Sequence, residues 1–251
     1  MERLVLKMKN YCGFKSTDKE RDGVLEFPGI TVLVGNNGTR KRDILSALIF
    51  YKCTALKQEW RQPIPEYKPI INPGCDKAVI SLNDCCSTEL TMAWLKKEQQ
   101  YRLTLRNLST VPSPFTNVIW TGIPEAIGYP PNFELAHVQD VTAGDLYISE
   151  NPELQLYDTW QANIGDQLCD LVAQKSVRVV LDTNSEIIYE RVRVNVANGK
   201  LKPDDALVYY FNRVDKDTIE YTQLKIDARG NLSMYPEGFF SQHTQNLLQL
   251  A

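Results

Sequence analysis

Residues 35–43 contain two glycines and three successive basic residues, between a run of β-branched residues and an amphipathic segment. Nucleotide-binding proteins hold phosphate groups with the pattern G-x-x-x-x-G-K-[ST], placed between a strand and a helix. The glycines let backbone N–H groups surround the phosphates, the lysine reaches the outer phosphates, and the hydroxyl contacts magnesium. We therefore predict a phosphate-binding loop that consists of Gly35, Asn36, Asn37, Gly38, Thr39, Arg40, Lys41, Arg42 and Asp43.

The segment departs from that pattern at two positions. Gly35 and Lys41 are in register, but Arg40 stands at the second glycine and Arg42 at the Ser or Thr. Arg40 adds a side chain where the backbone must approach a phosphate, and Arg42 replaces a magnesium ligand with a cation. Asp43 is a neighbouring carboxylate, one residue out of register. A turn followed by a basic helix start explains the local pattern equally well, and such a helix start could still hold an anion.

The surrounding sequence predicts the elements that would position this loop. Apolar alternation and β-branched runs predict strands at residues 3–9, 24–27, 30–34, 78–82, 89–95, 101–105, 145–149, 177–181, 206–211 and 219–226. Helical spacing of apolar residues predicts helices at 44–56, 160–173 and 187–198. Residues 10–22, 60–75 and 110–133 are polar or proline-rich and are expected to be irregular. The pattern predicts one α/β domain spanning 1–251, with an antiparallel subdomain at about 76–108.

Composition excludes several classes of protein. The 251 residues are 43% hydrophobic and 24% charged, which is typical of a globular protein and not of a disordered chain. The 28 basic and 31 acidic residues give a net charge of −3, which argues against a nucleic-acid coat protein but leaves a local basic patch open. No stretch approaches the roughly 18 apolar residues that span a bilayer. The six cysteines form no C-x-x-C pair, so we expect free thiols in the cytoplasm.

Two further segments carry a family resemblance. An apolar strand runs into Ser149-Glu150-Asn151-Pro152-Glu153, and a second runs into Asp182-Thr183-Asn184-Ser185-Glu186. These resemble the E-N-P-E Walker B segment and the E-T-H-S-E switch of ATP-binding-cassette (ABC)-type AAA ATPases, in the bacterial SMC-like and OLD-nuclease-related group. The N-terminal strand with residues 10–14 is similar to the family's N-F-x-x-F, and residues 235–240 are similar to a W-P-x-G-F-F tail. The resemblance covers 1–57 and 140–245.

The resemblance implies an ABC-type P-loop ATPase head with a mixed sheet flanked by helices, and ATP and magnesium as its cofactors. Lys41 matches the phosphate-loop lysine, and Glu150 matches the acid that holds magnesium. With Glu153 and Asn184, Glu150 makes up the candidate catalytic set. Asn184 replaces the switch histidine, however, and Gln155 and Tyr157 replace both histidines of the family's H-L-H-P segment. No S-G-G-Q signature precedes the Walker B strand.

These departures favour a degenerate head with weak or absent ATP hydrolysis, because phosphoryl transfer depends on positioned charges. The resemblance implies a structural or regulatory subunit, either a homodimer or a complex with another ATPase, a nuclease or a toxin. Bacterial defence systems are one setting of such relatives. The alternative is a divergent but active ATPase in which Glu150 and Asp43 hold magnesium. A third hypothesis is a nucleic-acid-binding module that uses residues 40–42, with salt-sensitive binding.

Overall fold

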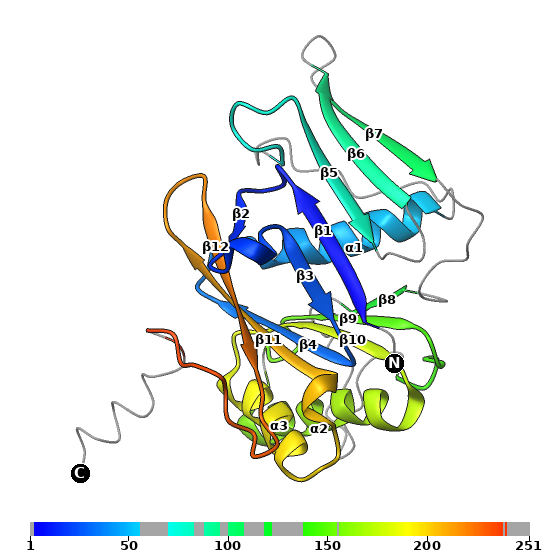
Figure 1. Cartoon of the computed structure of the whole chain (residues 1–251). Helices are drawn as coiled ribbons and strands as arrows, with labels where there is room; N and C mark the ends of the chain where they lie inside the picture. Colours follow the sequence, from blue (N-terminus) through cyan, green and yellow to red (C-terminus); the bar gives the residue numbers. More distant parts are fainter. Residues whose placement is uncertain are drawn as a thin grey trace.

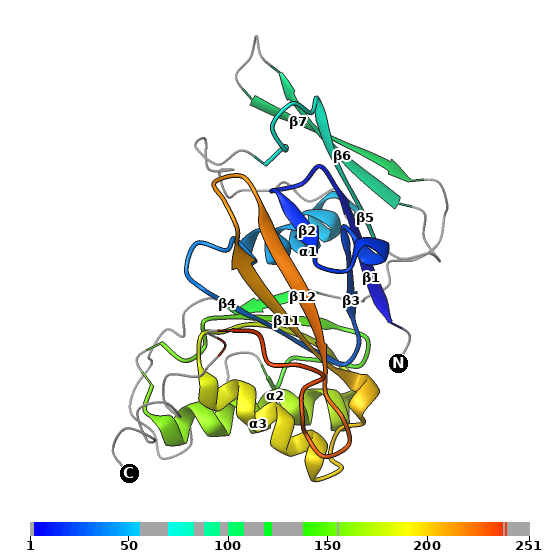
Figure 2. The same cartoon turned by 60° about the vertical axis from the view of Figure 1, so that its left-hand side comes forward.

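The computed structural model describes residues 3–55, 70–82, 88–95, 100–107, 118–121, 138–154, 156–237 and 239. Two β-sheets and the helices between and below them form successive layers in this part of the chain (Figure 1). An antiparallel sheet lies on one side, helix α1 lies between the sheets, and helices α2 and α3 cover the far face of the second sheet. Figure 2 shows the same layers from another side.

The larger sheet has seven strands in the order β2-β12-β11-β4-β10-β9-β8. Its strands are β2 (Phe14–Ser16), β12 (Ile219–Lys225), β11 (Ala206–Arg213), β4 (Ile30–Gly35), β10 (Arg178–Asp182), β9 (Leu146–Glu150) and β8 (Val118–Thr121). The strands from β11 to β8 are parallel, and β12 is antiparallel to β11. The mixed sheet confirms the predicted fold class.

The centre of this sheet is buried on both faces. Every residue of β9 and β10 is buried, which explains the three successive apolar residues in each strand. Successive residues alternate between two hydrophobic cores: Leu33 and Val180 pack toward α1 and the other sheet, whereas Val32 and Val179 pack toward α2 and α3. Because successive side chains of a strand point to opposite faces of the sheet, each of these residues contributes to one core only.

The smaller sheet has the order β3-β1-β5-β6-β7 and is antiparallel. Its strands are β3 (Val24–Phe27), β1 (Leu4–Lys9), β5 (Lys77–Leu82), β6 (Thr88–Leu95) and β7 (Gln100–Asn107). The predicted antiparallel subdomain at about 76–108 supplies β5, β6 and β7. The sheet also includes the N-terminal strands β1 and β3, which the prediction placed outside that subdomain.

Two short strands and two short 3-10 helices were not predicted. Strand β2 and helix η1 (Lys19–Arg21) lie in the segment expected to be a loop, and β8 lies within the proline-rich stretch at 110–133. Helix η2 (Pro203–Asp205) precedes β11. Helices α1 (Lys41–Ala55), α2 (Asp158–Lys175) and α3 (Glu186–Ala197) agree with the predicted helices within a few residues. Among the described residues, no helix is long and apolar enough to cross a membrane.

The topology brings the predicted motifs to one edge of the larger sheet. Strands β4, β10 and β9 are adjacent and parallel, with Asp182 paired to Leu33 on one side and to Glu150 on the other. Their carboxyl ends therefore lie together, and the loops that follow them meet. Ligands of open α/β sheets bind at such an edge.

Candidate functional site

The loop after β4 has a positive φ at both positions where the phosphate-loop pattern has glycine, residues 35 and 40. Gly35 has φ +148°, and a Cβ atom there would overlap the carbonyl oxygen of Phe211. Arg40 has φ +59°, a left-handed conformation that favours glycine, at the position where the pattern has its second glycine. The Thr39 hydroxyl donates to the Asn36 carbonyl at 2.7 Å and closes the turn. Position 40 therefore keeps a glycine-like backbone with an arginine side chain.

Lys41 connects this loop to the segment after β10. Its Nζ atom donates to the Gly35 carbonyl at 3.0 Å and to Asn184 Oδ1 at 3.3 Å. The same atom lies 3.6 Å from Asp182 Oδ1, and both side chains are 7% exposed. The structure thus brings together Lys41 and Asn184, two residues that the sequence analysis placed in one site.

The two arginines beside Lys41 are also paired with carboxylates. Arg40 Nε lies 2.6 Å from Asp43 Oδ2, and Arg42 Nε lies 3.2 Å from Glu150 Oε1. All three cations of the loop therefore have an acidic partner within the chain. Asp43, suggested as a magnesium ligand, forms an ion pair with Arg40.

Glu153 connects the loops after β9 and β10. Its Oε2 atom accepts a hydrogen bond from the Thr183 hydroxyl at 2.7 Å, and its Oε1 atom accepts one from the Asn184 backbone N–H at 2.8 Å. The Asn151 N–H donates to the Asp182 carbonyl at 2.7 Å, and Asn151 has φ +47°. Both carboxylate oxygens of Glu153 are therefore used in holding this edge together.

Asp182 is a member of the site that the sequence analysis did not select. Burial raises its pKa to about 6, the positive charge of Lys41 opposes that rise, and the neighbouring carboxylates Glu150 and Glu153 add to it. Its Oδ1 atom is buried and accepts no hydrogen bond. The signal was present in the sequence, because Asp182 ends an apolar strand in the way that Glu150 does.

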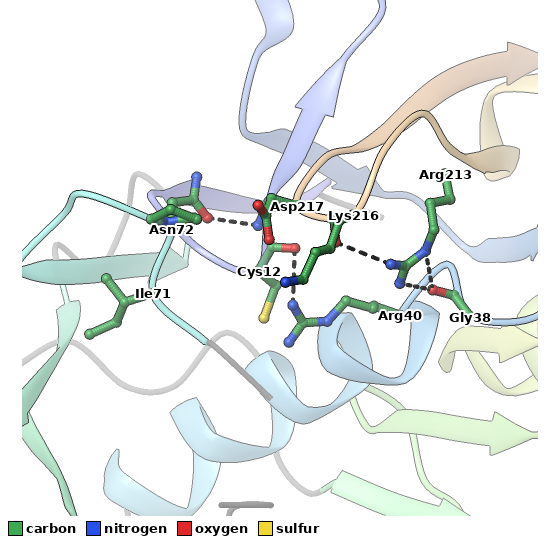
Figure 3. A pocket seen from close by; sticks show the side chains of 10 residues that line it. Cys12, Gly38, Arg40, Ile71, Asn72, Arg213, Lys216 and Asp217 are labelled. Atoms are coloured by element: carbon green, nitrogen blue, oxygen red, sulfur yellow. Dashed lines mark hydrogen bonds between the residues drawn. The ribbon is translucent and has the colours of Figure 1, made fainter. Parts of the chain in front are cut away.

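Cavities lie on both sides of the loop. The first, of about 320 Å³, is lined by Arg40, Arg213 and Lys216 among others (Figure 3). Arg213 donates through Nε to the Gly38 carbonyl at 3.1 Å, and through Nη1 to the Lys216 carbonyl at 3.2 Å. The second, of about 250 Å³, is lined by Val34, Gly35, Asn36, Asn37, Asn184, Tyr210 and Phe239. Arg213, which lines the first cavity, is exposed, and its hydrogen bond to the Gly38 carbonyl holds the tip of the loop.

These residues do not fit a magnesium ion. A magnesium site needs oxygen ligands in near-octahedral geometry. Position 42 offers a guanidinium in place of a hydroxyl, and that guanidinium lies against the Glu150 oxygen that would face the metal. The loop backbone and Lys41, by contrast, fit a phosphate group.

Comparisons with known proteins agree with the fold. A family model described as "Protein of unknown function (DUF3696)" matches residues 201–250, and no curated protein matches the sequence. The SMC head domain from Thermotoga maritima is similar at a TM-score of 0.50 and 11% identity, over 88% of this chain and 98% of that one. An SMC head bound to the C-winged helix domain of ScpA has a TM-score of 0.49 and 10% identity, over 89% and 97%. The chain thus has the fold of an SMC head, an ABC-type ATPase head, as predicted.

Proposed function

We propose that this chain is a degenerate ABC-type ATPase head of the SMC-like and OLD-nuclease-related group. In this proposal it hydrolyses ATP very slowly or not at all and acts as a structural or regulatory subunit. The observation that supports it most strongly is the ion pair between Arg42 and Glu150, 3.2 Å apart, where an active head would hold magnesium.

The other candidate catalytic residues support the same proposal. Phosphoryl transfer depends on positioned charges, and loss of one positioned donor costs about 10²–10³ in rate. Asn184 offers an amide in place of the imidazole of the family's switch histidine. Glu153, the remaining carboxylate, already accepts hydrogen bonds from Thr183 and Asn184 and is thus poorly suited to activate water.

We expect the wild-type protein to release phosphate from Mg-ATP no faster than Lys41→Ala does. Lys41 is the residue of the loop that would contact the outer phosphates, so its removal abolishes any turnover at this site. The measurement is phosphate release at millimolar ATP, with Arg229→Ala as a folded control. Magnesium-dependent turnover that Lys41→Ala removes would instead establish the rival function, a divergent but active ATPase.

An exposed apolar patch beside the site favours a protein partner. Leu154 and Tyr157, which we call the rim patch, lie one and four residues after Glu153 and are 41% and 78% exposed. Large exposed apolar side chains grouped beside a functional edge are typical of interaction surfaces. We propose that this patch contacts a second copy of the chain or a subunit that is itself an ATPase, nuclease or toxin, for example in a bacterial defence complex.

We expect Tyr157→Ser to weaken that association by about tenfold or more, since burying a large aromatic side chain contributes strongly to interfaces. Sedimentation velocity over a range of concentrations measures self-association, and a photo-crosslinker at position 157 captures a different subunit in cells. Met234→Ser is the matched control, because Met234 is 50% exposed and follows β12 at the opposite end of the sheet. Equal effects of the two substitutions would argue against the rim patch.

A further inference from the structure

We propose that the Arg42 guanidinium takes the place of a divalent cation, so that this site binds a nucleotide polyphosphate without magnesium. The inference rests on the proposed function and deepens it, because it specifies which form of ligand a head without hydrolysis would hold. It concerns binding alone and involves no chemical step.

The first argument is the position of the guanidinium. Arg42 belongs to the first turn of α1, immediately after the lysine that fits a phosphate group. The Arg42 side chain is 58% exposed, whereas the Glu150 side chain is 11% exposed. The pair therefore presents its positive member at the surface of the site and its negative member inside, which is the arrangement that an approaching anion requires.

The second argument is chemical. A guanidinium is planar, always charged, and presents N–H donors in a fork that matches two phosphate oxygens. The N-terminus of α1 adds its own backbone donors and partial positive charge. Lys41 Nζ, now bonded to the Gly35 carbonyl and Asn184, can exchange those partners for phosphate oxygens. Three kinds of positive group thus meet at one point without a metal.

The third argument concerns the metal itself. A magnesium ion bound at Glu150 would stand beside the Arg42 guanidinium, and the two positive charges would repel each other. Magnesium would then have to displace an existing ion pair. Magnesium that binds the free nucleotide instead competes with the protein for the same phosphate oxygens. We therefore expect magnesium to leave the affinity unchanged or to reduce it.

A titration with a fluorescent ATP analogue, in EDTA and in millimolar magnesium, tests the inference on the wild-type chain. We expect binding in EDTA to be at least as tight as binding in magnesium, and inorganic tripolyphosphate to displace the analogue. Binding that is tenfold or more tighter with magnesium overturns the inference. Displacement by adenosine but not by tripolyphosphate also overturns it.

The variant Arg42→Ser restores the hydroxyl of the phosphate-loop pattern and provides the sharper result. We expect it to lose about tenfold or more in affinity in EDTA, as for loss of a charged hydrogen bond, and to bind more tightly when magnesium is added. Arg229→Ser is the matched control, in an exposed turn at the opposite end of β12, and circular dichroism confirms that both fold. Wild-type affinity of Arg42→Ser in EDTA overturns the inference.

The two proposals fail in different ways. Absence of binding by both the ATP analogue and tripolyphosphate at millimolar concentration overturns the metal-independent site but leaves a head that hydrolyses no ATP. Magnesium-dependent turnover overturns the proposed function and is detected by phosphate release, not by the titration.

Discussion

The variant Gly35→Ala is expected to be less stable than the wild type by about 3 kcal/mol. Gly35 ends β4 with φ +148°, where residues with a Cβ atom are strained by about 1–3 kcal/mol. The added Cβ would also overlap the Phe211 carbonyl oxygen on the neighbouring strand β11. Because that oxygen belongs to the backbone, relief requires β4 and β11 to separate at the edge that holds the site.

Gly38→Ala provides the control within the same loop. Gly38 also has a positive φ, +84°, but a Cβ atom there would meet nothing within 4 Å. Its expected cost is that of the backbone conformation alone, about 1 kcal/mol. Urea unfolding of the two variants separates the steric contribution from the conformational one. Equal losses would mean that β4 and β11 accommodate the methyl group without cost.

The contrast between Gly35 and Arg40 explains why the loop could be predicted only in part. The sequence pattern treats both positions as glycines, and the arginine at position 40 is its most conspicuous departure. The structure places Arg40 in the left-handed region at φ +59°, and its side chain forms an ion pair with Asp43 at 2.6 Å. A left-handed non-glycine residue costs about 1–2 kcal/mol, which a local ion pair can offset in part. The phosphate-loop pattern contains no such pair, so it does not predict that an arginine can occupy position 40.

The central strands could be predicted because buried strands consist mainly of apolar residues. Strands β4, β9 and β10 each contain successive apolar or β-branched residues, as expected of strands that are covered on both faces. Strand β2 has three residues, too few to show a period, and β8 lies in a proline-rich stretch that indicates irregular structure. The pairing of β1 with β5, which joins β1 and its neighbour β3 to the antiparallel subdomain, is a long-range contact that no local pattern encodes.

The loops that form the candidate site could be predicted from the sequence, but the ion pairs between their side chains could not. Parallel strands bring their carboxyl ends together, so motifs after β4, β9 and β10 had to meet. Which acid meets which cation depends on register, since a shift of one residue turns a side chain to the other face. Asp182 ends its strand as Glu150 does, so its place at this edge could be predicted, but its contact with Lys41 depends on its register beside Leu33 and Glu150.

The buried carboxyl of Asp182 predicts an unusual dependence of stability on pH. Its pKa is raised from the ordinary value of 3.8 to about 6 by burial, with Lys41 opposing the shift and Glu150 and Glu153 adding to it. Between those two values the folded chain holds a proton that the unfolded chain releases. This group therefore stabilises the fold at low pH, and that contribution is lost as the pH rises from about 4 to about 6.

The expected size of the effect follows from the two pKa values. The difference between 3.8 and 6 corresponds to about 3 kcal/mol at 1.36 kcal/mol per pH unit. Asp182→Asn carries no titrating group at this position. The wild type should therefore lose about this much free energy of unfolding, relative to the variant, between pH 4 and pH 7. Most carboxylates that form ion pairs act in the opposite direction, because their folded pKa is lowered.

Urea unfolding of wild type and Asp182→Asn at half-unit steps from pH 4 to pH 7.5 measures the difference directly, since the other titrating groups are common to both chains. Asp204→Asn is the surface control, with a side chain that is 93% exposed, and should follow the wild-type profile. Parallel profiles of wild type and Asp182→Asn would mean that Asp182 stays ionised throughout. Lys41, 3.6 Å away, would then have to offset the full cost of burying that charge, and the loop would be held by a true ion pair at every pH.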